Sequence, residues 1–222
     1  MSMRKPRWSF AVLLFLLLAM TFGCVTTDDK IKKSNGHYQE GLANFETDRQ
    51  KAFISFQQAV QLNPRHKEAH YSLGHLYALQ GKYPEAQEEF QKALRVDSDY
   101  SEAYNHLGQI YEKLNRWPDA IRSYQHALEN PLYATPDIAR YNLGLALVHE
   151  GDYQAATQAL EDALLVSPPT VPAAAIHLEL ARAYSKLGYR TQARESLLRV
   201  STLDRGGQYA AEAEKLMERL KP

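Results

Sequence analysis

The chain has 222 residues, enough for a substantial hydrophobic core in one elongated domain or two small ones. It contains 26 basic and 26 acidic residues, and this zero net charge argues against a chain that binds nucleic acid through overall positive charge. The first 23 residues hold three of the basic residues and none of the acidic ones, so we expect the remainder to present a mildly acidic, soluble surface.

Residues 1–23 have the three parts of a secretory signal peptide. The basic segment MRKPR is followed by an apolar run from Trp8 to Phe22 and then by the small residue Gly23. In such segments the charge stays in the cytosol while the apolar run enters the translocon. The run is about fifteen residues long, short of the roughly 20 that span a bilayer as a helix. We predict a cleaved signal peptide, with an uncleaved anchor as the alternative.

Cys24, the only cysteine of the chain, directly follows this segment, so it has no disulfide partner within the chain. The pair Gly23-Cys24 resembles the lipobox of bacterial lipoproteins, with Thr21 and Phe22 where that family usually has a leucine and a small residue. In that family the thiol is lipidated and the peptide is cut before the cysteine. The resemblance therefore implies that Cys24 is a lipid attachment site, and two or more acyl chains there give stable anchoring. The alternative is a cysteine that ends a signal peptide by chance.

Residues 24–36 are predicted to form a polar tether, because the segment TTDDKIKKSNG lacks apolar periodicity. The lipoprotein resemblance also implies to which membrane the protein is sorted. In enterobacterial lipoproteins an aspartate after the cysteine favours retention at the inner membrane, and Val25 stands at that place here. We therefore expect a chain held by its lipid at the periplasmic face of the outer membrane.

The rest of the sequence repeats itself with a stride of 34 residues. The residues that return after one stride are apolar or small: Leu73, Gly74 and Tyr77 return as Leu107, Gly108 and Tyr111, and Ala86, Phe90 and Ala93 return as Ala120, Tyr124 and Ala127. The spacings place one apolar stripe on each of two successive helices. The two helices are expected to cross closely at the small residues Gly74 and Ala86.

These residues resemble the tetratricopeptide repeat, and the resemblance implies an all-α, right-handed superhelical solenoid of helix pairs. Gly81 is expected to end a first helix in the left-handed conformation, and Pro84 suits the first turn of the next helix. We predict about five repeats over residues 37–205, of which the first is degraded, with Gly41 nearest to the expected glycine. Residues 206–222 are predicted to contain a capping helix with a polar outer face.

No arrangement of residues in the sequence predicts catalysis, so the chain is expected to be non-enzymatic and to need no cofactor or metal. The strongest contrary signal is the segment HKEAH, in which His66 and His70 are four residues apart, as zinc ligands on one helix face would be. His66 follows Asn63-Pro64 in a predicted turn, however, and the order differs from the His-Glu-x-x-His of metalloproteases. Packing or surface histidines are therefore favoured over a metal site.

A solenoid of this kind offers a concave groove that is lined by one face of each first helix. The register of the repeat predicts that the partner-binding groove includes Tyr71, His75, Leu79, Asn105, Gln109, Ile138, Tyr141, Leu145, Val148 and Arg182. The same face carries Glu68, Glu102, Glu112, Leu178 and Ser185, so the groove is expected to run from polar and acidic to apolar. An apolar patch there would hold a partner helix or an extended peptide, unless its residues pack on neighbouring helices instead.

The combination of lipobox, short tether and repeats resembles the type IV pilus biogenesis and stability lipoproteins, which act as pilotins for the outer-membrane secretin. The tract LENPLYATPDIARYNLGLAL carries this resemblance, since a Leu-Tyr insertion (Leu132-Tyr133) precedes an Asn-Leu-Gly-Leu helix (Asn142 to Leu145). The resemblance implies a scaffold that helps secretin subunits reach the outer membrane and assemble there. The alternatives are an adaptor for cell-wall hydrolases or synthases, a subunit of the β-barrel assembly machinery, and, far behind, an enzyme with a metal at His66 and His70.

Overall fold

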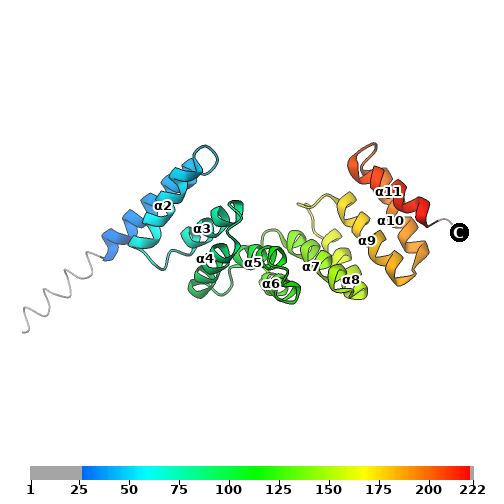
Figure 1. Ribbon diagram of the computed structural model, residues 1–222, viewed down its shortest axis with the longest axis horizontal. Coiled ribbons are helices and arrows are strands. Elements are labelled where there is room, and N and C mark those ends of the chain that lie inside the picture. Colours follow the sequence, from blue (N-terminus) through cyan, green and yellow to red (C-terminus); the bar gives the residue numbers. More distant parts are fainter. Residues whose placement is uncertain (1–26, 221–222) are drawn as a thin grey trace, which may run out of the picture.

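The computed structural model describes residues 27–220, so the predicted signal peptide and Cys24 lie outside the described residues. Within this range all regular structure is helical and no strand is present. Figure 1 shows the helices as hairpin pairs that follow one another along the long axis of an extended, twisted molecule. The fold is the superhelical solenoid of helix pairs that the repeat predicts.

Each pair consists of a first helix and a second helix that pack against each other, and each second helix also packs on the first helix of the next pair. The bounds are residues 27–44 with α2 (Arg49–Leu62), α3 (Lys67–Leu79) with α4 (Tyr83–Val96), α5 (Ser101–Lys113) with α6 (Trp117–Glu129), α7 (Pro136–Glu150) with α8 (Tyr153–Leu164), and α9 (Ala173–Leu187) with α10 (Arg190–Leu203). The last helix, α11 (Gln208–Arg219), packs on α10 and α9 at the C-terminal end.

The core lies between the two helices of each pair, and the second helices supply its largest fully buried side chains. Phe56, Phe90, Tyr124, Leu160 and Leu197 occupy equivalent places on α2, α4, α6, α8 and α10, and all five are 0% exposed. Burying a side chain of this size contributes about 1.5–3 kcal/mol. Fully buried alanines flank the first four on both sides, and Ala193 and Val200 flank Leu197, which allows the neighbouring helices to approach closely.

The turns within the pairs have the residue types and backbone conformations that the sequence predicts. Gly81 has φ +72°, in the left-handed region, and Pro84 lies in the first turn of α4. In the next pair the same place is taken by Asn115, which has φ +57° although it is not a glycine. Asparagine is the residue besides glycine that most readily adopts this conformation, so both pairs turn in the same way.

The predicted polar tether is wrong for residues 27–36, which form the first half of the helix 27–44. Ser34 is fully buried in this helix, and its Oγ donates a hydrogen bond to the carbonyl oxygen of Ala59 on α2 (2.8 Å). Gly41 lies against Phe56 as Gly74 lies against Phe90. The first pair is therefore more regular than its sequence suggests, because a helix at the end of a solenoid buries only one narrow stripe and its other residues can be polar.

Two longer connections distinguish the fourth pair from the others. They are residues 130–135, before α7, and residues 165–172, before α9. The fully buried Asp137 joins the second connection to α7, since its Oδ2 accepts hydrogen bonds from the backbone amides of Thr170 (2.5 Å) and Val171 (2.8 Å). The contact between Asp137 and residues 170–171 is not predicted from the sequence.

Candidate functional site

The candidate site is the inner face of the solenoid, which is formed by the first helices of the pairs. Successive first helices contact one another along this face, as α3 does with α5, α5 with α7, and α7 with α9. Most of the residues predicted to line the groove are partly exposed: Tyr71, His75, Leu79, Gln109, Ile138, Tyr141, Leu145, Val148 and Arg182. The face is therefore a continuous surface with apolar and polar sections.

At the N-terminal end of the inner face, aromatic rings from three pairs form one connected row. The ring of Phe45 lies 5.3 Å from that of His75, which lies 5.2 Å from that of His106. Tyr71 contacts His106 (5.4 Å between ring centroids) and also Tyr100 at the start of α5 (5.2 Å). Such a row offers the large, rigid contact surface that aromatic residues provide in interfaces.

Burial changes the ionisation of this row. It lowers the pKa of His106 to about 4, and the nearby His75 adds to the effect, so the ring is neutral at neutral pH. It also raises the pKa of Tyr71 to about 12, with a further contribution from the charge of Glu102. The row is therefore an uncharged surface that carries polar ring nitrogens and hydroxyls.

Leu79 is the most exposed of the predicted apolar groove residues, with 49% of its surface accessible. It lies one turn beyond His75 on α3, so the two side chains share a face. Farther along the solenoid, Val148 packs against the core of the third and fourth pairs, and Tyr141 packs against the core of the fourth and fifth. The apolar residues of α7 thus divide their surface between the core and the groove.

At the C-terminal end the inner face is polar. Arg182 of α9 pairs with Glu179 (2.6 Å) and also with Glu212 of α11, so it connects the last repeat to the capping helix. Burial raises the pKa of Glu179, and Arg182 opposes this rise. Tyr141 lies close enough to this group for the charge of Glu179 to act on it, and burial raises its pKa to about 12. Tyr141 and Arg182 therefore belong to one polar cluster.

Two residues of the predicted face do not reach its surface. Asn105 is 4% exposed, and its Oδ1 accepts a hydrogen bond from Nδ2 of Asn142 on α7 (3.1 Å). Leu178 is 3% exposed and belongs to the core beside α10 and α11. Both side chains hold helices together instead of facing a partner, since Asn105 joins the first helices α5 and α7 and Leu178 packs toward α10 and α11.

The first pair also contributes to the inner face, with residues that are not among those predicted to line the groove. Leu42 is 43% exposed, and Phe45 begins the aromatic row. Leu42 follows Gly41 as His75 follows Gly74, so the repeat register already contained the signal.

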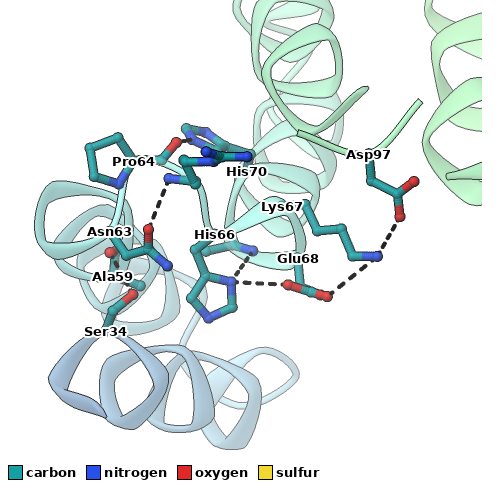
Figure 2. A network of polar contacts seen from close by, with 11 residues as sticks. Ser34, Ala59, Asn63, Pro64, His66, Lys67, Glu68, His70 and Asp97 are labelled. Carbon is teal, nitrogen blue, oxygen red and sulfur yellow. Dashed lines mark hydrogen bonds and ion pairs between the residues drawn. The ribbon is translucent and has the colours of Figure 1, made fainter. Parts of the chain in front are cut away.

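His66 and His70 are engaged by the protein and do not form a metal site. Figure 2 shows the two rings turned toward different partners. Nδ1 of His66 faces the backbone amide of Ala69 (3.4 Å) and Oε2 of Glu68 (3.1 Å). Nε2 of His70 faces the carbonyl oxygen of Pro64 (3.0 Å), and its Nδ1 faces the carboxylate of Glu89 (2.6 Å). Residues 27–220 contain no group of three or more histidine, cysteine or acidic side chains arranged to hold a metal ion.

Polar contacts near His66 join the helices within the first and second pairs and reach the start of the third pair. Ser34 joins the first helix to α2, and Glu68 lies beside both His66 and Lys67 on α3. Lys67 then donates to Asp97 at the end of α4 (2.5 Å). Its Nζ also lies 5.1 Å from the centre of the Tyr100 ring. Of these contacts, the one between Lys67 and the Tyr100 ring connects two successive pairs.

None of the helices within residues 27–220 is long and apolar enough to cross a bilayer. Any membrane attachment through the predicted signal segment or Cys24 concerns residues outside the described part of the chain.

Comparison with protein families gives three overlapping matches, all to tetratricopeptide repeat profiles, at residues 67–131, 107–175 and 147–220. The chain belongs to the tetratricopeptide repeat family. These are helical repeats that serve in protein–protein interaction, which agrees with an extended inner face of apolar and aromatic residues. A comparison with curated protein sequences finds no match.

Solved structures of several tetratricopeptide repeat proteins share the fold. PilF of Pseudomonas aeruginosa superimposes with a TM-score of 0.73 at 22% identity, over 86% of this chain and 84% of that one. PilW, described as a widely conserved type IV pilus biogenesis factor, gives a TM-score of 0.66 at 25% identity, over 76% of each chain. YrrB, described as having an unusual peptide-binding site, gives 0.67 at 24% identity, over 84% of this chain and 90% of that one.

Proposed function

We propose that this protein is an envelope lipoprotein whose inner face binds a partner protein, and that it assists the localisation and multimerisation of the outer-membrane secretin in type IV pilus biogenesis. The observation that carries the binding role is the surface formed by Leu42, Phe45, His75 and Leu79. There two leucines that are almost half exposed flank a row of aromatic contacts. An apolar surface of this kind on a repeat solenoid is suited to a partner helix or extended segment.

Two independent features support the pilus role. One is the resemblance of the Leu132-to-Leu145 tract to pilotin lipoproteins, together with the segment that precedes Cys24. The other is the fold shared with PilF and PilW over three quarters or more of each chain. On this proposal the lipid on Cys24 holds the protein at the periplasmic face of the outer membrane, and the inner face receives a segment of the secretin subunit.

The first experiment compares secretin assembly in three strains: the wild type, a deletion, and a strain that carries Cys24→Ala. Heat-resistant secretin multimers are measured in separated inner and outer membranes. The proposal requires loss of multimers in the deletion and monomeric, mislocalised secretin with Cys24→Ala. Normal outer-membrane multimers in both mutant strains would exclude the pilus role and favour an adaptor for other envelope proteins, such as cell-wall enzymes.

The second experiment tests the inner face with a matched pair of leucine substitutions. Leu79→Arg places a charge on the proposed binding surface, whereas Leu198→Arg makes the same change at a leucine that is 60% exposed on the second helix α10. Both residues are exposed enough for the chain to fold normally. We expect fewer secretin multimers with Leu79→Arg and wild-type levels with Leu198→Arg. Equal multimer levels in both variants would remove the inner face from the proposal while leaving the anchor result intact.

A further inference from the structure

A second concave surface lies on the opposite side of the solenoid from the inner face. It is a cleft of about 520 Å³ between the ends of α2 and α4, which are the second helices of two successive pairs. Its apolar part consists of Val60, Val96 and Pro64, and its polar part includes Arg65, Lys92 and Arg95. Because second helices form it, this cleft is accessible while the inner face is occupied.

The base of the cleft contains the buried ring of His70, which the protein holds on both sides. Nε2 lies 3.0 Å from the carbonyl oxygen of Pro64, and Nδ1 lies 2.6 Å from a carboxylate oxygen of Glu89. These contacts fix the ring between the turn at Pro64 and α4, so the two helix ends that form the cleft are joined through it.

The cleft contains more positive than negative charge. Lys92 pairs with Glu88 (2.8 Å) and with Glu89 (2.8 Å), which are its two acidic neighbours on α4. Within residues 27–220, Arg65 and Arg95 form no ion pair. The three cations Arg65, Lys92 and Arg95 therefore face two carboxylates. The carboxylate of Asp97 lies nearby, but it is paired with Lys67 and therefore does not change this balance of charge.

We propose that this cleft binds an acidic segment of a partner protein in which aliphatic residues accompany the carboxylates. The planar guanidinium groups of Arg65 and Arg95 match the geometry of carboxylates, and a leucine- or valine-sized side chain fits against Val60 and Val96. A lipid headgroup matches the cleft less well. It would leave the apolar part unused, and a concave surface does not lie flat on a bilayer.

An unbiased selection tests this proposal. A display library of random twelve-residue peptides is selected on the immobilised full-length protein and on the variant Arg65→Glu/Arg95→Glu. The matched control Arg190→Glu/Arg194→Glu changes two exposed arginines of α10, another second helix, by the same charge. We expect peptides that combine acidic and aliphatic residues to be enriched on the wild type and the control but not on the cleft variant. Equal enrichment on all three proteins, or enriched peptides without acidic residues, would overturn the proposal.

An enriched peptide is then synthesised and its affinity measured. We expect about tenfold weaker binding to Arg65→Glu/Arg95→Glu than to the control, and weaker binding to the wild type at high salt. The milder pair Arg65→Gln/Arg95→Gln, also expected to weaken binding, replaces the charge-reversed one if that variant is misfolded. Sedimentation with phosphatidylglycerol vesicles that depends on these arginines, without any acidic peptide being selected, would assign the cleft to membranes and overturn the proposal. None of these readouts depends on secretin assembly, so the proposal stands or fails separately from the pilus role.

Discussion

Gly108 leaves the space that the ring of Tyr124 occupies. A Cβ atom at position 108 would lie 2.5 Å from Cε1 of Tyr124, and Tyr124 is fully buried. The same relationship joins Gly74 to Phe90 in the preceding pair. The small residue therefore fits a specific ring on the second helix, whereas the sequence analysis explained it only by a close crossing of the two helices.

Replacing Gly108 with alanine is expected to destabilise the protein. The added methyl group forces the rigid, enclosed ring of Tyr124 to move, which costs about 1–3 kcal/mol. Gly36→Ala is the matched control, because a Cβ there meets no atom within 4 Å and alanine favours a helix. Urea unfolding measures both variants. Unfolding free energies that stay equal to the wild type in Gly108→Ala would contradict the contact with Tyr124.

The helix at residues 27–44 makes a second prediction, because a tether and a helix respond differently to proline. Asn35 is exposed in the middle of this helix, so Asn35→Pro changes the backbone without removing a buried side chain. It should cost about 3 kcal/mol in a helix and almost nothing in a tether. Thermal unfolding of Asn35→Pro and of the control Asn35→Ala distinguishes the two structures. Equal melting temperatures in the two variants would contradict the helix and support the predicted tether.

The hydrogen bonds of Asp137 lead to a third prediction, which concerns the stability of the connection 165–172. Asp137→Ala removes the acceptor of the amides of Thr170 and Val171, and each lost hydrogen bond costs about 0.5–1.5 kcal/mol. Hydrogen exchange at these two amides should become faster, while exchange in α3 stays unchanged. Asp137→Asn keeps one acceptor oxygen, so it should lie between alanine and wild type. Slow exchange at both amides in Asp137→Ala would show that another group holds the connection.

The buried histidines predict how stability depends on pH. Burial lowers the pKa of His66, His75, His106 and His177 in the folded chain, and that of His106 falls to about 4. The unfolded chain then binds more protons than the folded chain between about pH 6.5 and pH 4. The contribution of these histidines to the free energy of unfolding is therefore highest above pH 6.5 and falls as the pH decreases through this window.

Substitution of His106 is the most direct test of this pH dependence of the unfolding free energy. Its titration should remove about 1–2 kcal/mol of stability between pH 7 and pH 5. Urea unfolding at half-unit steps measures the slope above pH 5, where most carboxylates stay ionised. His106→Gln should reduce the slope, whereas His126→Gln, at an exposed histidine on α6, should leave it unchanged. An unaltered slope in His106→Gln would assign the loss of stability to other groups.

Several predicted features depend on local chemistry and are found in the structure. Gly81 ends its turn in the left-handed conformation, and Pro84 opens α4. The alanines and large apolar residues that recur on each second helix form the core. These features follow from spacing and residue size, which every repeat expresses in the same way.

The candidate site was predicted less completely. Leu79 lies exposed where the register placed it, whereas Asn105 is buried against Asn142 and Arg182 is held by ion pairs. The register says which side of a helix a residue occupies. It does not say how closely the next helix approaches, and this distance decides whether a polar side chain bonds to its neighbour or faces solvent.

By itself the sequence determined that this chain is a solenoid of helix pairs, because a 34-residue period of small and apolar residues fits one repeating supersecondary unit. Only the tertiary structure decided that residues 27–36 are helical, since Ser34 and Gly41 gain their partners from α2. It also brought Val60, Arg65 and Arg95 together around one cleft. Contacts between residues some thirty positions apart in sequence depend on how successive pairs stack, and no local pattern specifies that geometry.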